Sequence, residues 1–202
     1  MKDKFEDLYW NRVKNIFSES INVKSMFYNK NYDKIFQAAE VIFSCIFFNH
    51  GKVLIFGNGG SAADSQHIAG EFINRFLIDR KSYPAIALTT DTSVITAIGN
   101  DYSYDEIFSR QVDALATSVD ICIGISTSGN SINVLNGLKA AKEKGSKIIT
   151  FLGCDGGIIA KEIDADIHFI VPSNSTPRIQ ETHILLAHTL CEIVEDALTK
   201  KD

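Results

Sequence analysis

The chain has 202 residues, of which 45% are hydrophobic and 22% are charged. This length and composition are typical of a single soluble globular domain, so they exclude a disordered chain and a fibrous protein. The formal net charge is −5 and no long run of Lys or Arg occurs, which excludes a surface for direct binding to nucleic acid. An anionic ligand would have to be held by local dipoles.

No segment of the sequence predicts export or membrane insertion. The N-terminus alternates charged residues and lacks the apolar stretch of a secretory signal. The most hydrophobic segment, residues 38–48, contains Glu40 and is shorter than the roughly 20 residues of a membrane span. We therefore expect a cytoplasmic protein without a membrane partner, in which the cysteines are reduced and buried. They are Cys45, Cys122, Cys154 and Cys191.

Two hydrophobic patterns follow one another along the chain. The first fifty residues have helical patterning, clearest over residues 32–49, and a stop at His50-Gly51. From residue 52 onward, short apolar runs alternate with helical segments. The predicted strands are residues 52–57, 84–88, 119–125, 147–152 and 167–171, and the predicted helices are residues 62–79, 92–98, 104–114, 131–144, 157–161 and 177–198.

This alternation predicts an α/β protein with a parallel sheet that is covered on both faces. We expect a three-layer α/β/α sandwich with a five-stranded parallel sheet. An N-terminal extension of several helices, residues 1–50, would serve oligomerisation and belong to the same domain as residues 51–202. Ligands of such sheets bind at the carboxyl ends of the strands, so the loops after Gly57, Leu88 and Ile125 are the places to search.

Polar and glycine-rich residues follow the strands in these loops. Ser126-Thr-Ser-Gly-Asn-Ser131 opens a helix, so its hydroxyls, backbone N–H groups and helix dipole could bind a phosphate without a lysine. Gly57-Asn-Gly-Gly-Ser61 is a second such loop, without the spacing of a dinucleotide site. Each could be an ordinary turn, but two at successive strand ends favour a site. Asn100-Asp101 is either a turn or a pair of groups for sugar hydroxyls.

Several ionisable side chains could supply chemistry beside these loops. His67 and Glu71 lie four residues apart on a predicted helix, and therefore on one face, where they could bind a metal, share acid/base work or form an ordinary surface pair. On the last predicted helix, Gln180 and His188 lie eight residues apart. The apolar surroundings of His188 predict that it is partly buried, either as a core residue or as a further member of the site.

Taken in order, these motifs resemble the phosphoheptose isomerases, a family of the sugar isomerase (SIS) domain superfamily, over almost the whole chain. The resemblance implies the SIS fold and an aldose–ketose isomerase. Its reaction would convert sedoheptulose 7-phosphate to D-glycero-D-manno-heptose 7-phosphate, the first step towards ADP- or GDP-heptose for lipopolysaccharide or another surface polysaccharide. The resemblance also implies one zinc ion per subunit and a homotetramer with active sites between subunits.

The family's functional residues can be carried over by position. Glu71 and His188 would be the catalytic acid/base pair. The implied zinc ligands are His67, Glu71, Gln180 and His188. The implied substrate contacts are Asn58, Gly59, Gly60, Glu71, Asn100, Asp101, Ser126, Thr127, Ser128, Ser131 and Gln180. The sequence departs from some relatives at Pro177, where they carry an acidic residue that touches the sugar, so the reaction class is better defined than the exact sugar.

Two other functions remain open from the sequence. The DnaA initiator-associating proteins resemble this family but act as tetrameric, non-enzymatic scaffolds, and they lack counterparts of Glu71 and His188, which this chain has. A sugar-phosphate-sensing regulator or another SIS enzyme is the second alternative. Regulators usually carry an added DNA-binding module, for which 202 residues leave no room.

Overall fold

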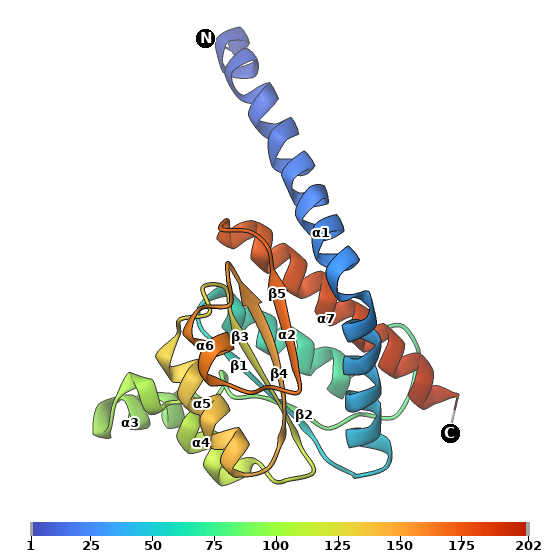
Figure 1. Cartoon of the computed structure of the whole chain (residues 1–202), viewed down its shortest axis with the longest axis vertical. Helices are drawn as coiled ribbons and strands as arrows, with labels where there is room; N and C mark the ends of the chain where they lie inside the picture. Colours follow the sequence, from blue (N-terminus) through green and yellow to red (C-terminus); the bar gives the residue numbers. More distant parts are fainter. Residues whose placement is uncertain (1, 201–202) are drawn as a thin grey trace.

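The computed structural model describes residues 2–200, which form a parallel sheet between two layers of helices and one long helix that extends beyond them (Figure 1). The sheet has five strands, all parallel, in the order β2-β1-β3-β4-β5. Their bounds are β1 Val53–Gly57, β2 Ala85–Ala87, β3 Ile121–Ser126, β4 Lys147–Gly153 and β5 Ile167–Val171. The predicted three-layer α/β/α architecture with a five-stranded parallel sheet is confirmed.

The helices divide between the two faces of the sheet. They are α1 Lys2–Phe47, α2 Gly60–Ile73, α3 Thr92–Asp101, α4 Ser109–Leu115, α5 Ile132–Glu143, α6 Gly157–Glu162 and α7 Thr176–Thr199, with a short 3-10 helix, η1, at Tyr104–Glu106. On β1, Val53 and Ile55 pack in one core with α1, α2 and α7, whereas Leu54 and Phe56 pack in a second core with the other helices. This alternation follows from the two-residue period of a strand.

The largest differences from the sequence-based predictions lie in three helical segments. Residues 2–47 form one helix, α1, rather than several; the absence of Gly and Pro from these residues was the available signal. The helix predicted over residues 62–79 ends at Ile73, because the backbone N–H groups of residues 76–78 donate hydrogen bonds to the Glu195 carboxylate instead of to helix carbonyls. The segment 104–114 is divided into η1 and α4, since the Ser109 hydroxyl bonds to the Glu106 carbonyl and competes for the backbone there.

Three of the four cysteines are buried as expected, whereas Cys154 is not. The four cysteines are free thiols; Cys45, Cys122 and Cys191 are buried and Cys154 is half-buried. Burial raises the pKa of the Cys122 thiol to about 12, so this side chain is an inert part of the core. Over residues 2–200, none of the helices combines the length and the hydropathy of a membrane span.

The strand order places a topological switch point between β1 and β3. The chain leaves β1 towards β2 on one side and returns to β3 on the other, so the loops that follow β1 and β3 diverge at this point. In open parallel sheets, such a switch point forms a crevice at the carboxyl ends of the two strands. Two of the three loops named in the sequence analysis, those after Gly57 and after Ile125, lie there.

Candidate active site

The loop after β3 forms a small cradle of hydroxyl groups at the start of α5. Ser131 is the N-cap residue of α5, but its side chain makes no capping bond; its Oγ lies 3.0 Å from the Oγ of Ser126. The Ser128 hydroxyl accepts the N–H of Asn130, which closes the turn between them. Hydroxyl groups and the positive end of the helix dipole therefore meet in one place, as an anion site requires.

The loop after β1 is joined to this cradle by a pair of amides. Asn58 Nδ2 donates to Asn133 Oδ1 at 2.7 Å, and Asn133 Nδ2 donates back to Asn58 Oδ1 at 2.9 Å. The Tyr104 hydroxyl donates to the same Asn58 oxygen at 3.0 Å. Asn58 is half-buried, so these bonds fix its side chain and hold the two loops together.

Glycine is required where the loop after β1 becomes α2. Gly59 has a φ of +55°, a conformation that side chains disfavour. A Cβ on Gly60 would lie 2.0 Å from Nε2 of Gln180, so the Gln180 amide is packed directly against the first residue of α2. The structure thus brings Gln180, from the first turns of α7, to the loop after β1.

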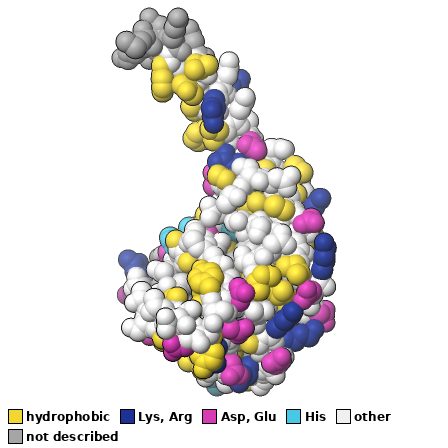
Figure 2. Space-filling view, turned by 90° about the vertical axis from the view of Figure 1, so that its left-hand side faces the viewer, with side chains coloured by type: hydrophobic (Ala, Val, Ile, Leu, Met, Phe, Trp, Pro, Cys, Tyr) yellow, Lys and Arg dark blue, Asp and Glu magenta, His cyan; other side chains and the backbone are white. Residues whose placement is uncertain are grey.

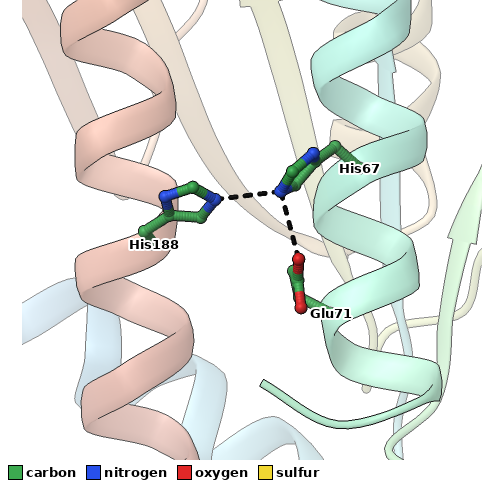
Figure 3. Close-up of side chains that lie close together, drawn as sticks. All are labelled: His67, Glu71 and His188. Carbon is green, nitrogen blue, oxygen red and sulfur yellow. Dashed lines mark hydrogen bonds and ion pairs between the residues drawn. The ribbon is translucent and has the colours of Figure 1, made fainter. Parts of the chain in front are cut away.

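Further along the same two helices, three ligand-type side chains converge. Nε2 of His67 lies 2.9 Å from Nε2 of His188 and 3.1 Å from Oε1 of Glu71 (Figure 3). One ligand atom of each residue lies within 4.8 Å of the others. The His67 side chain is 48% exposed and that of Glu71 is 24% exposed, and His188 is half-buried as predicted. The cluster therefore opens to solvent between α2 and α7.

Two further side chains border this cluster. The Phe76 ring packs against the His188 imidazole with 5.4 Å between centroids. Asp64 lies one turn before His67 on α2, and its Oδ2 atom is buried without a hydrogen-bond partner. Burial raises the pKa of Asp64, and the nearby His67 opposes that shift. The Phe76 ring thus contacts the cluster, and the partly buried carboxyl group of Asp64 lies near it on α2.

The donor set fits a zinc ion. Imidazole nitrogen and carboxylate oxygen are common zinc ligands, and two nitrogens bound tetrahedrally to one zinc lie about 3.3 Å apart. The imidazoles need to separate only slightly from 2.9 Å to reach that spacing. Gln180 lies eight residues before His188 on α7, and its amide is packed against Gly60 at the start of α2. Its role as a ligand stays a prediction.

The remaining predicted contacts lie in different surroundings. Ser126, Thr127, Ser128 and Ser131 form the cradle, and Asn58, Gly59 and Gly60 border it. Asn100 and Asp101 are exposed at the end of α3, where Asn100 Nδ2 donates to Asp101 Oδ1 at 2.8 Å. Because α3 packs on the face of the sheet opposite α2 and α7, one chain does not bring this pair to the histidine cluster (Figure 1).

Several residues that shape the site were not predicted from the sequence. Asn133 and Tyr104 fix Asn58, Phe76 contacts His188, and Asp64 borders His67. Asp64 could have been found from its spacing, since it lies three residues before His67 on one helix. The contacts of Tyr104, Phe76 and Asn133 depend on the tertiary fold, and the sequence contains no local signal for them.

Comparison with known proteins identifies the domain family to which this chain belongs. Residues 16–153 match the family model described as SIS domain. This match covers more than half of the chain, so the chain is a SIS domain protein.

Individual relatives narrow the class to one family. The phosphoheptose isomerase of Thermodesulfovibrio yellowstonii is 51% identical over 187 residues, which cover 93% of this chain and 92% of that protein. That of Aquifex aeolicus is 51% identical over 190 residues, covering 94% and 98%. The structure of the phosphoheptose isomerase of Neisseria gonorrhoeae has a TM-score of 0.86 at 46% identity and covers 93% of this chain and 98% of its own. The chain belongs to the phosphoheptose isomerase family.

Proposed function

We propose that this protein is the isomerase that interconverts sedoheptulose 7-phosphate and D-glycero-D-manno-heptose 7-phosphate, at the first step towards nucleotide-activated heptose. The observation that carries the proposal is the convergence of His67, Glu71 and His188 between α7 and α2, the helix that begins at the loop after β1, in a chain of the phosphoheptose isomerase family. A scaffold of the DnaA initiator-associating type is not favoured, because the chain retains Glu71 and His188 and its relatives are phosphoheptose isomerases.

The cradle residues bind the phosphate in this proposal. Ser126, Ser128 and Ser131 offer hydroxyl donors, and the start of α5 adds backbone N–H groups with the positive end of its dipole. Seven residues of α2 separate Gly60 from His67, or about 10 Å. That separation suits an extended seven-carbon sugar held by its phosphate at one end and by the reacting carbons at the other.

Glu71 and His188 move the protons. Aldose–ketose isomerisation removes a proton from the carbon beside a carbonyl and returns one to the neighbouring carbon, while a proton also passes between the two oxygens. The Glu71 carboxylate can accept and return the carbon-bound proton. The His188 imidazole, which packs against the Phe76 ring, can carry the proton that passes between the two substrate oxygen atoms. His67 contacts both groups and fixes their distance.

Zinc is the metal that we propose, with His67, Glu71 and His188 as ligands and Gln180 as a further ligand. When bound, zinc supplies polarisation of the substrate carbonyl and stabilisation of the negative charge that develops on it.

We also propose a cytoplasmic homotetramer with active sites between subunits. The projecting part of α1 carries apolar side chains that the chain itself leaves exposed (Figure 2). Exposed apolar area of this kind marks a contact with another protein chain. The residues concerned include Leu8, Trp10, Val13, Phe17 and Ile21, each at least 53% exposed. Light scattering should give four times the chain mass of 22.3 kDa.

A coupled assay with sedoheptulose 7-phosphate tests the proposed activity. Purified protein supplied with zinc should form the heptose phosphate, and a chelator should abolish the reaction reversibly. Glu71→Gln and His188→Ala should be inactive yet keep the circular dichroism and the oligomeric mass of the wild type. Wild-type protein that remains inert with zinc present would contradict the proposal.

A further inference from the structure

A buried ion pair links the segment that follows α2 to α7. Nε of Arg80 donates to Oε1 of Glu195 at 2.9 Å, and the two side chains are only 4% and 2% exposed. Arg80 belongs to the segment after α2, and Glu195 lies on α7, seven residues after His188. The pair therefore joins the two helices that carry the cluster.

Glu195 organises the segment that follows α2. Its carboxylate accepts the backbone N–H of Phe76 at 2.8 Å, of Leu77 at 2.7 Å and of Ile78 at 3.0 Å, besides the Arg80 guanidinium. Charge-assisted bonds of this kind are stronger than neutral ones. They bend residues 76–78 around one carboxylate, and this places the Phe76 ring against the His188 imidazole.

Arg80 fixes the end of α2. Its Nη1 donates to the carbonyl of Phe72 at 2.8 Å, and its Nη2 donates to the carbonyl of Glu71 at 2.8 Å. The last carbonyl groups of a helix have no partner within it, so the guanidinium completes the final turn of α2. One of these carbonyls belongs to Glu71, whose carboxylate faces His67.

We propose that Arg80 and Glu195 are positioning residues that set the location of the Glu71 carboxylate relative to the His188 imidazole. Arg80 acts on Glu71 through its backbone carbonyl, and Glu195 acts on His188 through Phe76. The consequence for catalysis rests on the function proposed above, whereas the placement of the imidazole does not depend on it. A fall in rate is expected because misplacement of reacting groups by about 1 Å can cost 100-fold.

The chemistry of the Arg80–Glu195 pair supports a role in positioning the site rather than in stabilising the fold. A buried ion pair is weak evidence for stability, because desolvation of both charges offsets their attraction. What an apolar pair could not reproduce is the set of directed bonds: Glu195 accepts four, and the planar guanidinium reaches Glu195, Phe72 and Glu71 together. Lysine keeps the charge but lacks this fork.

The test compares Glu195→Gln and Arg80→Lys with a matched control, Asp120→Asn. Asp120 is also a buried carboxylate, 1% exposed, that accepts bonds from the N–H groups of Lys52 and Thr117, the Thr117 hydroxyl and the Lys52 ammonium. It precedes β3, at the opposite end of that strand from Ser126. Loss of its bonds should weaken the fold without moving the cluster.

Each variant is measured in two ways. NMR of protein labelled with ¹³C-histidine, assigned with His67→Gln and His188→Gln, reports the ring environment of each imidazole, including the ring current of Phe76 on His188. Steady-state kinetics with sedoheptulose 7-phosphate give kcat and KM separately. Glu195→Gln and Arg80→Lys should shift the His188 resonance and lower kcat about 10- to 100-fold, with KM changed less than threefold because the phosphate cradle is untouched.

Asp120→Asn should leave the His188 resonance and kcat as in the wild type. If Glu195→Gln does not fold, the inference is tested with Arg80→Lys alone. An unshifted His188 resonance in a folded Arg80 or Glu195 variant overturns the inference, and so does a shifted resonance with an unchanged kcat. Wild-type protein without isomerase activity refutes the proposed function instead, and the resonance then still tests the placement of His188.

Discussion

Nε2 of His67 and Nε2 of His188 face each other across 2.9 Å, although the residues are 121 positions apart in the sequence. Gly60 meets Gln180 at the start of α2, and His67 meets His188 seven residues later, so α2 and α7 run side by side in the same direction. Two imidazole nitrogens at this distance need a proton or a cation between their lone pairs. The carboxylate of Glu71 beside them favours a cation.

The first prediction concerns metal binding. Because His67 contacts both other members of the cluster, His67→Ala should weaken zinc binding at least 10-fold while the fold is retained. Competition with a chromophoric chelator measures the affinity. His50→Ala, at an exposed histidine in the turn after α1, is the control and should bind zinc as the wild type does. If the His67 variant and the wild type bind zinc with equal affinity, this cluster is not the metal site.

Loss of the Glu71 carboxylate should affect turnover rather than substrate affinity. Glu71→Gln keeps the size of the side chain but cannot accept a proton, so kcat should fall by about 10²- to 10⁴-fold, the usual contribution of a general acid or base. Steady-state kinetics at saturating zinc separate kcat from KM. Glu192→Gln, at an exposed position on α7, should keep the wild-type rate. A Glu71 variant with more than a tenth of that rate would contradict the role.

Gly60 and Gly70 make a matched pair on α2. Gly60→Ala places a methyl group where Nε2 of Gln180 now lies, so Gln180 must move and kcat/KM should fall about 10-fold. A Cβ on Gly70 meets nothing within 4 Å, so Gly70→Ala should stabilise the protein by about 0.5–1 kcal/mol and keep full activity. Kinetics and urea denaturation measure the two effects. Wild-type kinetics in Gly60→Ala would show that Gln180 has no part in the reaction.

Stability should depend on pH through His183, a buried residue of α7. Burial lowers the pKa of His183 from 6.5 to about 4, while its Nε2 hydrogen bonds to the Leu152 carbonyl at 3.0 Å. The unfolded chain binds a proton below pH 6.5 and the folded protein does not, so the free energy of unfolding decreases as the pH falls from 6.5 towards 4. The decrease amounts to about 3 kcal/mol, at 1.36 kcal/mol per pH unit.

Urea denaturation at pH 7, 6 and 5 measures this slope. His183→Gln keeps an N–H donor for Leu152 but does not titrate, so its slope should be smaller. The pKa values of Asp120 and Glu195 are lowered in the fold, so their stabilisation is lost only below their ordinary values of 3.8 and 4.5 and does not contribute in this range. An equal slope in the variant and the wild type would exclude His183 as its source.

The sheet and the two loops could be predicted from the sequence because their signals are local. The apolar run of residues 52–57, for example, ends at a glycine, and the next residues prefer turns. His67 and Glu71 could be placed on one face from their spacing alone. Their meeting with His188 followed only from resemblance, since helical periodicity does not indicate which helix lies beside which.

The end of α2 illustrates what the sequence could not reveal. Helical patterning continues past Ile73, and the structure breaks it because a carboxylate 117–119 residues further along the chain accepts the backbone N–H groups of residues 76–78. The same carboxylate binds Arg80, a residue that the sequence alone did not single out. Interactions at this separation leave no pattern in a single sequence. They determine where Phe76 and Glu71 lie in the site.

The projecting part of α1 carries the only tryptophan of the chain, Trp10, which is 75% exposed. Its fluorescence therefore reports on that segment of α1 and not on the sheet or the histidine cluster. Emission at the wavelength of a water-exposed indole would describe a lone chain, whereas a blue shift that disappears on dilution would report that other chains cover the helix. The protein thus contains an intrinsic probe of its own assembly that needs no label.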